Sequence, residues 1–284
     1  MNSAGHVEQV TDQKTVWNGR GGRAWVEAQD ALDRMFTPFE DLLVQQVPAG
    51  SSWSILDVGC GTGATTLALA RRTGPGGRAV GIDISEPMIT LARQRAESEG
   101  SAASFLVADA QTHGFDSASF DLITSRFGVM FFSDPAAAFT NLRRCLRPAG
   151  ALAAIAWRGA AENPFMTTAE QAAAPLLPDI PARRPDGPGQ FAFADRGKVT
   201  SILNGSGWAE VDLEPLDITC TLPAAELDRY VTRLGPLGLV LQDADEATRS
   251  RVIDAVRSAF RPFAHGDEIR YSAACWMVRA RAPR

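Results

Sequence analysis

The chain has 284 residues, 45% hydrophobic and 21% charged, a composition that excludes collagen, coiled coils and extensive disorder. This length suits one large domain carrying an appended part. The formal net charge of −5 argues against a basic surface that would attract nucleic acid or an acidic membrane.

The cysteines and the N-terminal region indicate the cellular compartment of the protein. Four widely spaced cysteines without a C-x-x-C pair predict neither a disulfide framework nor a metal site, and they fit a reducing compartment. The first thirty residues lack an apolar run, so no secretory signal is expected. The most apolar stretch, 148–157, is shorter than the roughly 18 residues of a membrane helix. A cytoplasmic protein with no membrane segment is therefore expected.

The N-terminal half predicts helices followed by a regular α/β unit. Helical spacing from Trp25 to Leu43, with Pro38 expected to interrupt it at Thr37, predicts two consecutive helices. From Trp53 to Trp157, alternating patterns predict βαβ units and a parallel sheet covered on both faces. The expected strands are 53–58, 78–83, 104–108, 120–125 and 151–157, and the expected helices are 62–72, 86–98 and 135–147.

The pattern changes after Trp157. Residues 160–195 are rich in proline and predict a short helix followed by an irregular excursion. A strand with one wet face is expected around 211–213, and a last strand at 269–280. Helices are expected between them at 224–234 and 244–263.

A glycine-rich turn is the strongest local motif. The buried strand at 55–58 leads into Gly59, Gly61 and Gly63 at a helix start, where glycine lets the backbone pass close to a ligand. The spacing Gly59-x-Gly61-x-x-Ala64 also fits a dinucleotide fingerprint loosely. This turn alone leaves NAD open as the ligand.

Three acidic residues bear on that choice. Asp57, in the expected site mouth, would repel a pyrophosphate and attract an ammonium group, directly or through a water. Asp83 ends the next strand, where either cofactor would present its ribose hydroxyls. Asp109 ends the third strand, placed to accept a hydrogen bond from an exocyclic amine such as adenine N6. Asp57 and Asp109 weigh against NAD.

Residues 53–157 resemble the class I S-adenosylmethionine-dependent methyltransferases. The resemblance rests on the glycine turn and the three acidic residues, together with Met88, Ala110 and the run Phe120-Asp121-Leu122-Ile123. The run 125–132 followed by Asp134-Pro135 is similar to the small-molecule branch that includes ubiquinone- and menaquinone-pathway enzymes. The resemblance implies an α/β doubly wound, Rossmann-like fold, with a seven-stranded, mostly parallel sheet whose last strand is antiparallel and with helical cap insertions. It also implies methyl transfer to a small, partly apolar metabolite, with S-adenosylhomocysteine as product.

The resemblance also implies roles for individual residues. Backbone at Gly59, Cys60 and Gly61 would face the methionine part, Asp83 the ribose, and Met88 the adenine. Asp109 and the Ala110 amide would read the adenine edge, with Ser125 and Arg126 beside the methionine end. The implied cofactor-binding set is Trp17, Trp25, Asp57, Gly59, Cys60, Gly61, Gly63, Asp83, Ile84, Met88, Asp109, Ala110, Ser125 and Arg126. For Trp17 and Trp25, core packing is the alternative.

Methyl transfer from a sulfonium mainly requires alignment and a dry site, so no catalytic triad is expected. The candidate orienting or basic groups are Arg126, His265 and Tyr271. Arg126 could hold a carboxylate or pair with Asp134, and His113 is expected in a surface turn. Aromatic residues could line an apolar acceptor pocket, while Arg183 and Arg184 are expected in solvent. The aromatic candidates are 127–132, Phe191 and Phe193.

The expected organisation is an N-terminal helical lid at 1–50, a cofactor-binding core at 51–158, a cap excursion at 159–195 and a helical cap insertion at 223–264. Segments 196–222 and 265–284 complete the core sheet. An NAD-dependent oxidoreductase and a non-catalytic S-adenosylmethionine-binding protein remain the alternatives. The sequence does not define the oligomeric state.

Overall fold

The structure, a computed structural model, describes residues 12–178, 180–181, 183 and 187–284. The strands are β1 (Ser54–Val58), β2 (Arg78–Asp83), β3 (Ser104–Val107), β4 (Phe120–Arg126), β5 (Leu146–Trp157), β6 (Ala209–Pro223), β7 (Ala264–His265) and β8 (Glu268–Arg281). The α-helices are α1 (Gln13–Asn18), α2 (Arg20–Glu27), α3 (Gln29–Val44), α4 (Ala64–Arg72), α5 (Glu86–Glu99), α6 (Pro135–Cys145), α7 (Pro164–Ala173), α8 (Arg196–Gly205), α9 (Leu227–Arg233), α10 (Gly235–Leu241) and α11 (Glu246–Ala259). Single 3₁₀ turns lie at η1 (Val129–Phe131), η2 (Ala160–Glu162), η3 (Ala224–Glu226) and η4 (Arg261–Phe263).

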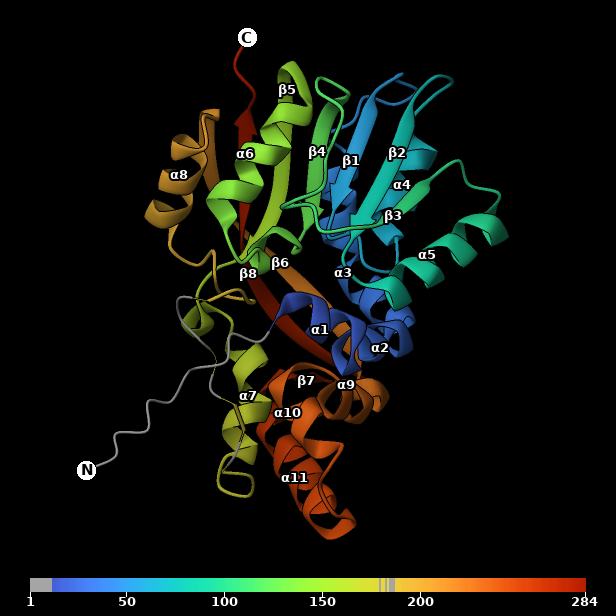
Figure 1. The fold of residues 1–284 in the computed structure, drawn as a ribbon. Helices are drawn as coiled ribbons and strands as arrows, with labels where there is room; N and C mark the ends of the chain where they lie inside the picture. The colour runs from blue at the N-terminus through green and yellow to red at the C-terminus, as the bar shows by residue number, and fades with distance from the viewer. Residues whose placement is uncertain (1–11, 179, 182, 184–186) are drawn as a thin grey trace, which may run out of the picture.

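The sheet has the strand order β3-β2-β1-β4-β5-β8-β6, and the short β7 pairs with β8 (Figure 1). Strands β3, β2, β1, β4 and β5 pair in parallel, whereas β8 is antiparallel to both β5 and β6. The central strand β1 is buried along its whole length, as expected of a strand covered on both faces. The predicted fold class, with its antiparallel last strand, is confirmed.

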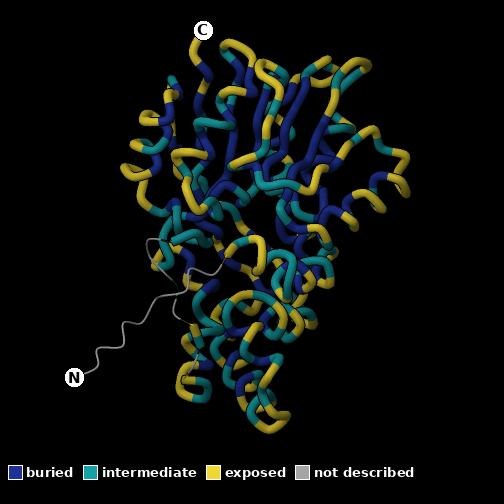
Figure 2. The backbone as a smooth tube through the Cα atoms, in the orientation of Figure 1, coloured by how far each residue is buried: buried dark blue, intermediate teal, exposed yellow. Residues whose placement is uncertain are grey.

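Helices cover both faces of this sheet, and the upper half of the molecule is dark with buried strands in Figure 2. Helix α3 packs against α4, while α6 packs against α8. Local capping fixes where the helices begin: Ser85, Asp134 and Asp245 each accept a hydrogen bond from a backbone N–H of the first turn of α5, α6 and α11. The carboxyl ends of the parallel strands are left facing the lower half of the molecule (Figure 1).

The lower half is built around two long strands. Strands β6 and β8 stay paired from Ala209 opposite Arg281 to Pro223 opposite Glu268, and so extend well beyond the core. Helices α7, α9, α10 and α11 gather around their far ends, and α1 and α2 lie between this group and the sheet (Figure 1). Helices α7 and α9–α11 are called the cap below, and α1–α2 the lid.

Two predictions about helices are wrong. Helix α3 continues through Pro38, and the break lies instead at Ala28, between α2 and α3. Phe36 and Phe39, on either side of the proline, are buried in the same core, so tertiary packing outweighs the lost helix donor. The interval at 235–243, where no helix was expected, contains α10, whose Gly235 and Gly238 obscure the pattern. Within the described residues, none of the helices is both long and apolar enough to span a bilayer.

Candidate functional site

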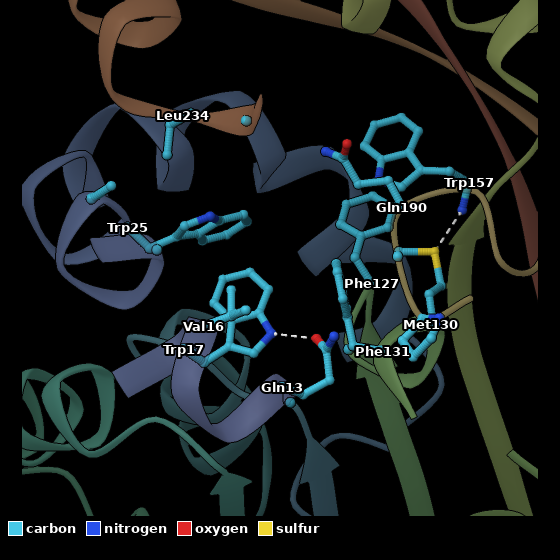
Figure 3. A pocket seen from close by; sticks show the side chains of 18 of the residues that line it. Gln13, Val16, Trp17, Trp25, Phe127, Met130, Phe131, Trp157, Gln190 and Leu234 are labelled. Atoms are coloured by element: carbon cyan, nitrogen blue, oxygen red, sulfur yellow. Dashed lines mark hydrogen bonds between the residues drawn. The ribbon is translucent and has the colours of Figure 1, made fainter. Parts of the chain in front are cut away.

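A cavity of about 740 Å³ lies where the carboxyl ends of the parallel strands meet the lid and the cap (Figure 3). This volume is within the range of about 300–1,000 Å³ typical of small-molecule sites. In an α/β sheet of this kind, ligands bind outside the carboxyl ends of the strands near the point where strand order reverses. Here that point is β1, which lies between β2 and β4.

The glycine turn after β1 forms part of the cavity wall. Gly59 has φ +66°, and a Cβ there would lie 2.6 Å from Gly128 Cα, so the turns after β1 and β4 touch through their backbones. Gly61 has φ +55°, and a Cβ there would meet only Met88 Sδ, at 3.8 Å. Because Gly61 and Met88 both line the cavity, the space above Gly61 is open to a ligand.

Asp83 joins this turn to the end of β2. Its Oδ2 accepts a hydrogen bond from the Gly61 N–H at 2.9 Å, and its Oδ1 accepts one from the Ser85 N–H at 2.9 Å. Burial raises the pKa of the carboxyl, and the Ser85 and Gly61 amides oppose that rise. Asp83 and Ile84 both line the cavity. The carboxylate is therefore held in place by two amides while it still faces the cavity.

The end of β3 supplies the next part of the wall. Asp109 and Ala110 line the cavity, and Asp109 Oδ1 accepts a hydrogen bond from the Gln111 N–H at 2.8 Å. The Gln111 side chain in turn accepts from the Asp134 N–H at 2.9 Å. The turn that carries Asp109 is thus attached to the start of α6.

Four residues of the expected cofactor set do not line the cavity: Asp57, Cys60, Gly63 and Ser125. Ser125 Oγ donates to Val58 O at 2.7 Å and accepts from the Gly128 N–H at 3.1 Å, so it joins the two turns from behind. Cys60 is buried on the sheet side, where a Cβ on Gly81 would approach its sulfur to 2.7 Å. These residues support the turn rather than forming its surface.

Asp57 differs most from expectation, because it lies beneath the glycine turn instead of in the site mouth. Its side chain is 1% exposed, and its oxygens accept hydrogen bonds from Thr66 Oγ1 at 2.7 Å and Thr124 Oγ1 at 3.4 Å. Burial raises the pKa of Asp57 to about 6, against the hydrogen bond from Thr66 and the charge of Arg126. Parallel pairing places Thr124 directly opposite Asp57, which explains this contact.

We expect Asp57→Asn to stabilise the ligand-free protein at pH 8. A carboxyl whose pKa rises from 3.8 to about 6 on folding adds stability below pH 3.8 and loses it as pH rises through 6. Removing the charge should raise the unfolding free energy by about 1–3 kcal/mol at pH 8 and change it little at pH 4. Urea unfolding at pH 8 and pH 4 measures the free energy of unfolding. Asp121→Asn is the control, because it removes a carboxylate that pairs with Arg147. A loss of stability at pH 8 in Asp57→Asn would contradict the assignment.

Arg126, at the end of β4, lines the cavity and lies over the Phe36 ring, 5.6 Å from its centroid. Its Nη1 is buried and has no hydrogen-bond partner among the described residues. The pairing with Asp134 considered above is wrong, because Asp134 caps α6 through the Ala137 N–H at 2.9 Å. A buried guanidinium donor without a partner is suited to an anionic group of a ligand.

The lid contributes both expected tryptophans to the cavity (Figure 3). Trp17 packs edge-on against Trp25 and against Phe131, with ring centroids 6.1 and 5.1 Å apart. The lid is also tied to the turn after β2, because Ser85 Oγ donates to Trp17 O at 2.6 Å and Asn18 Nδ2 donates to Ile84 O at 3.0 Å. The lid therefore contacts the same turn that carries Asp83.

An aromatic wall forms the other side of the cavity. Phe127 stacks on Trp157 with centroids 4.4 Å apart, and Met130 accepts a hydrogen bond at its sulfur from the Trp157 N–H (Figure 3). Phe191 also lines this side, whereas Phe193 is buried against Phe139 and does not reach it. Phe131, Phe132 and Phe165 also belong to this wall.

The structure does not bring the other two catalytic candidates into the cavity. His265 is exposed on β7, and Tyr271 is buried behind the wall, stacked on Phe165 with its hydroxyl donating to Met35 Sδ at 2.7 Å. His113 packs against Phe115 and also lies outside the cavity.

The sequence patterns did not point to four polar residues that line the cap side of the cavity, Glu170, Arg183, Gln190 and Tyr230. Arg183 was expected in solvent, but it is paired with Glu170 and its side chain is 22% exposed. Arg184 lies outside the described residues. Their sequence neighbourhoods carry no motif, so only the fold brings them to the site.

Comparisons with known proteins agree with this geometry. Residues 55–150 match the family described as "Methyltransferase domain". Nocamycin O-methyltransferase from Saccharothrix syringae is 31% identical over 204 residues, covering 67% of this chain and 71% of that protein. Demethylmenaquinone methyltransferase from Thermus thermophilus is 38% identical over 115 residues, or 40% of this chain and half of that protein. The crystal structure of the Bacillus protein YcgJ shares the fold, with a TM-score of 0.56, 15% identity, and coverage of 86% of this chain and 98% of that one.

The glycine turn, the two carboxylates that follow β2 and β3, and the relatives point to the same activity. The chain belongs to the S-adenosylmethionine-dependent methyltransferases that act on small molecules.

Proposed function

We propose that the cavity holds S-adenosylmethionine against the turns after β1, β2 and β3 and a small, partly apolar acceptor against the aromatic wall. One observation carries the proposal: a single continuous cavity has backbone and carboxylate groups on the strand side and mostly apolar side chains on the lid and cap side. Donor and acceptor could therefore meet without leaving the same enclosed space.

The residues present fit the cofactor. The open space above Gly61 lets a ligand approach the backbone, and the Asp83 carboxylate faces the cavity with oxygen lone pairs beyond those used by Gly61 and Ser85. Arg126 offers the methionine carboxylate a buried guanidinium donor that lacks a protein partner among the described residues. Asp109 and the backbone N–H of Ala110 would hold the adenine edge, and Ile84 and Met88 its faces.

Bound S-adenosylmethionine supplies a methyl group on a positively charged sulfur, which is already activated for transfer. The chain therefore has to bind, align and exclude water. The lid and the aromatic wall enclose the transfer region, and Trp17 and Trp25 contribute to both the lid and the cavity surface. Asp57, beneath the turn, adds negative charge under the methionine end, consistent with an attraction for its ammonium group.

The remaining assignments belong to the same proposal. Of the expected lid at 1–50, α1 and α2 would act as the lid, because α3 packs against α4 of the core and residues 1–11 lie outside the described residues. Segments 159–195 and 223–264 would act as the cap on a core of 51–158, completed by 196–222 and 265–284. The net charge of −5 supports a small-molecule acceptor over a nucleic acid, and the widely spaced cysteines fit the reducing cytoplasm. Asp109, which lines the cavity at the end of β3, favours this cofactor over NAD.

Calorimetric titration tests the choice of cofactor. We expect micromolar binding of S-adenosylmethionine and S-adenosylhomocysteine and no binding of NADH. A screen of metabolites for release of S-adenosylhomocysteine then distinguishes an enzyme that turns over from a protein that only binds. Binding of NADH alone would contradict the proposal.

A further inference from the structure

A polar cluster interrupts the apolar lining at the cap side of the cavity. It consists of Glu170 from α7, Arg183 and Gln190 from the segment that follows, and Tyr230 from α9, all of which line the cavity. None of these residues belongs to the sheet or to the turns assigned to the cofactor. The cluster is therefore available to the acceptor.

Arg183 organises the cluster. Its Nε and Nη2 donate to the two oxygens of Glu170 at 3.0 and 2.6 Å, and its Nη2 also donates to Met166 O at 3.2 Å. Its Nη1 donates to the Gln190 side-chain oxygen, and its guanidinium lies over the Phe191 ring, 5.2 Å from the centroid. A bidentate pair of this kind is rigid, so it fixes the segment around Gln190 against α7.

Tyr230 lines the cavity, and its hydroxyl makes no hydrogen bond to any other described residue. Burial raises the pKa of Tyr230 to about 12, and the charge of Arg183 opposes this rise while that of Glu170 adds to it. The hydroxyl therefore stays protonated at neutral pH and can donate a hydrogen bond to a ligand. Glu170 reaches this part of the cap, because a Cβ on Gly235, which follows the helix that carries Tyr230, would lie 3.8 Å from Glu170 Oε1.

The charges at this end of the cavity are matched. Arg183 and Glu170 neutralise each other, and Arg233 at the cavity edge pairs with Glu27 of the lid at 3.3 Å. An acceptor carboxylate placed here would lose its water without gaining an unpaired cation, which is unfavourable. A neutral oxygen-bearing group would gain a donor from Tyr230 and acceptors from Glu170 and Gln190.

We propose that Tyr230, with Glu170 and Gln190 lining the same side of the cavity, is the acceptor-binding subsite, and that it selects a mostly apolar acceptor carrying a neutral hydroxyl or ketone oxygen. Arg183 is a positioning residue that holds Glu170 and Gln190 in place. The proposal rests on the proposed function, because it takes the aromatic half of the cavity as the acceptor site.

The test compares three probes of similar shape bound to the protein saturated with S-adenosylhomocysteine at pH 7. The probes are 2-naphthol, which is neutral and carries a hydroxyl, 2-methylnaphthalene, which has a methyl in its place, and 2-naphthoate, which is anionic. Calorimetry should rank 2-naphthol as the tightest. Tyr230→Phe should weaken 2-naphthol five- to tenfold, the loss of one hydrogen bond, and leave 2-methylnaphthalene unchanged.

Tyr271→Phe is the matched control, because it removes the other tyrosine hydroxyl of the chain, which lies behind the wall. It should leave the ranking of the probes unaltered. The subsite is wrong if 2-naphthol fails to bind the wild type, if 2-naphthoate binds best, or if Tyr230→Phe weakens both neutral probes equally or neither. Failure of the proposed function would instead show as no binding of S-adenosylhomocysteine to the wild type, so the two failures are distinguishable.

Discussion

Asp83→Ala should weaken binding of S-adenosylhomocysteine by ten- to a hundredfold in calorimetric titration. The carboxylate lines the cavity on the strand side, where we propose that it binds the ribose hydroxyls, and each hydrogen bond to a charged acceptor contributes about 1.5–3 kcal/mol. The substitution also releases the Gly61 and Ser85 amides, so the turn above β1 loses its anchor. Asp83→Asn, which keeps one acceptor oxygen, should show a smaller loss.

Asp121→Ala is the control for this effect. Asp121 lies at the start of β4, at the opposite end of the sheet, where it accepts from the Ser54 N–H and pairs with Arg147. Its loss should lower the unfolding free energy and leave the affinity for S-adenosylhomocysteine within about twofold of wild type, a range expected for a site remote from the ligand. Equal affinity in Asp83→Ala and wild type would remove Asp83 from the cofactor site.

Gly59→Ala and Gly61→Ala should separate folding from cofactor binding. A methyl on Gly59 would lie 2.6 Å from Gly128 Cα in a positive-φ backbone, so the unfolding free energy should fall by about 2–4 kcal/mol. A methyl on Gly61 meets no protein atom closer than 3.8 Å, which leaves only the φ cost of about 1–2 kcal/mol. That methyl projects toward the cavity, so affinity for the cofactor should fall about tenfold or more.

Urea unfolding and calorimetry on both variants check this separation. A Gly61→Ala protein that folds and binds S-adenosylhomocysteine as tightly as wild type would show that the cofactor does not approach this turn. A Gly59→Ala protein of unchanged stability would contradict the contact between the turns after β1 and β4.

The sheet and the strand side of the cavity wall could be predicted from the sequence because their signals are local. Buried strands lead directly into Gly59, Asp83 and Asp109, and the carboxyl ends of neighbouring parallel strands necessarily meet. The same signals did not predict which way each side chain faces. Asp57 points to Thr66 and Thr124 beneath the turn because of strand register, and no spacing rule contains that information.

The cap side of the cavity could not be predicted, because contacts between distant segments build it. The chain has two tyrosines. Tyr271, near the last strand, was the predicted candidate, whereas Tyr230 lines the cavity. Arg183 looks solvent-exposed in sequence and becomes partly buried only because α7 places Glu170 next to it. The helix break predicted at Pro38 was wrong for the same reason. Packing of Phe36 and Phe39 on either side of the proline outweighed its local tendency to interrupt a helix.

The most direct test of the account is a crystal structure of the protein with S-adenosylhomocysteine bound. The account predicts the ribose hydroxyls at the Asp83 carboxylate, the adenine between Met88 and Asp109, the methionine carboxylate at Arg126, and the sulfur facing the aromatic wall. Density for the ligand outside this cavity, or with its sulfur directed away from that wall, would contradict it.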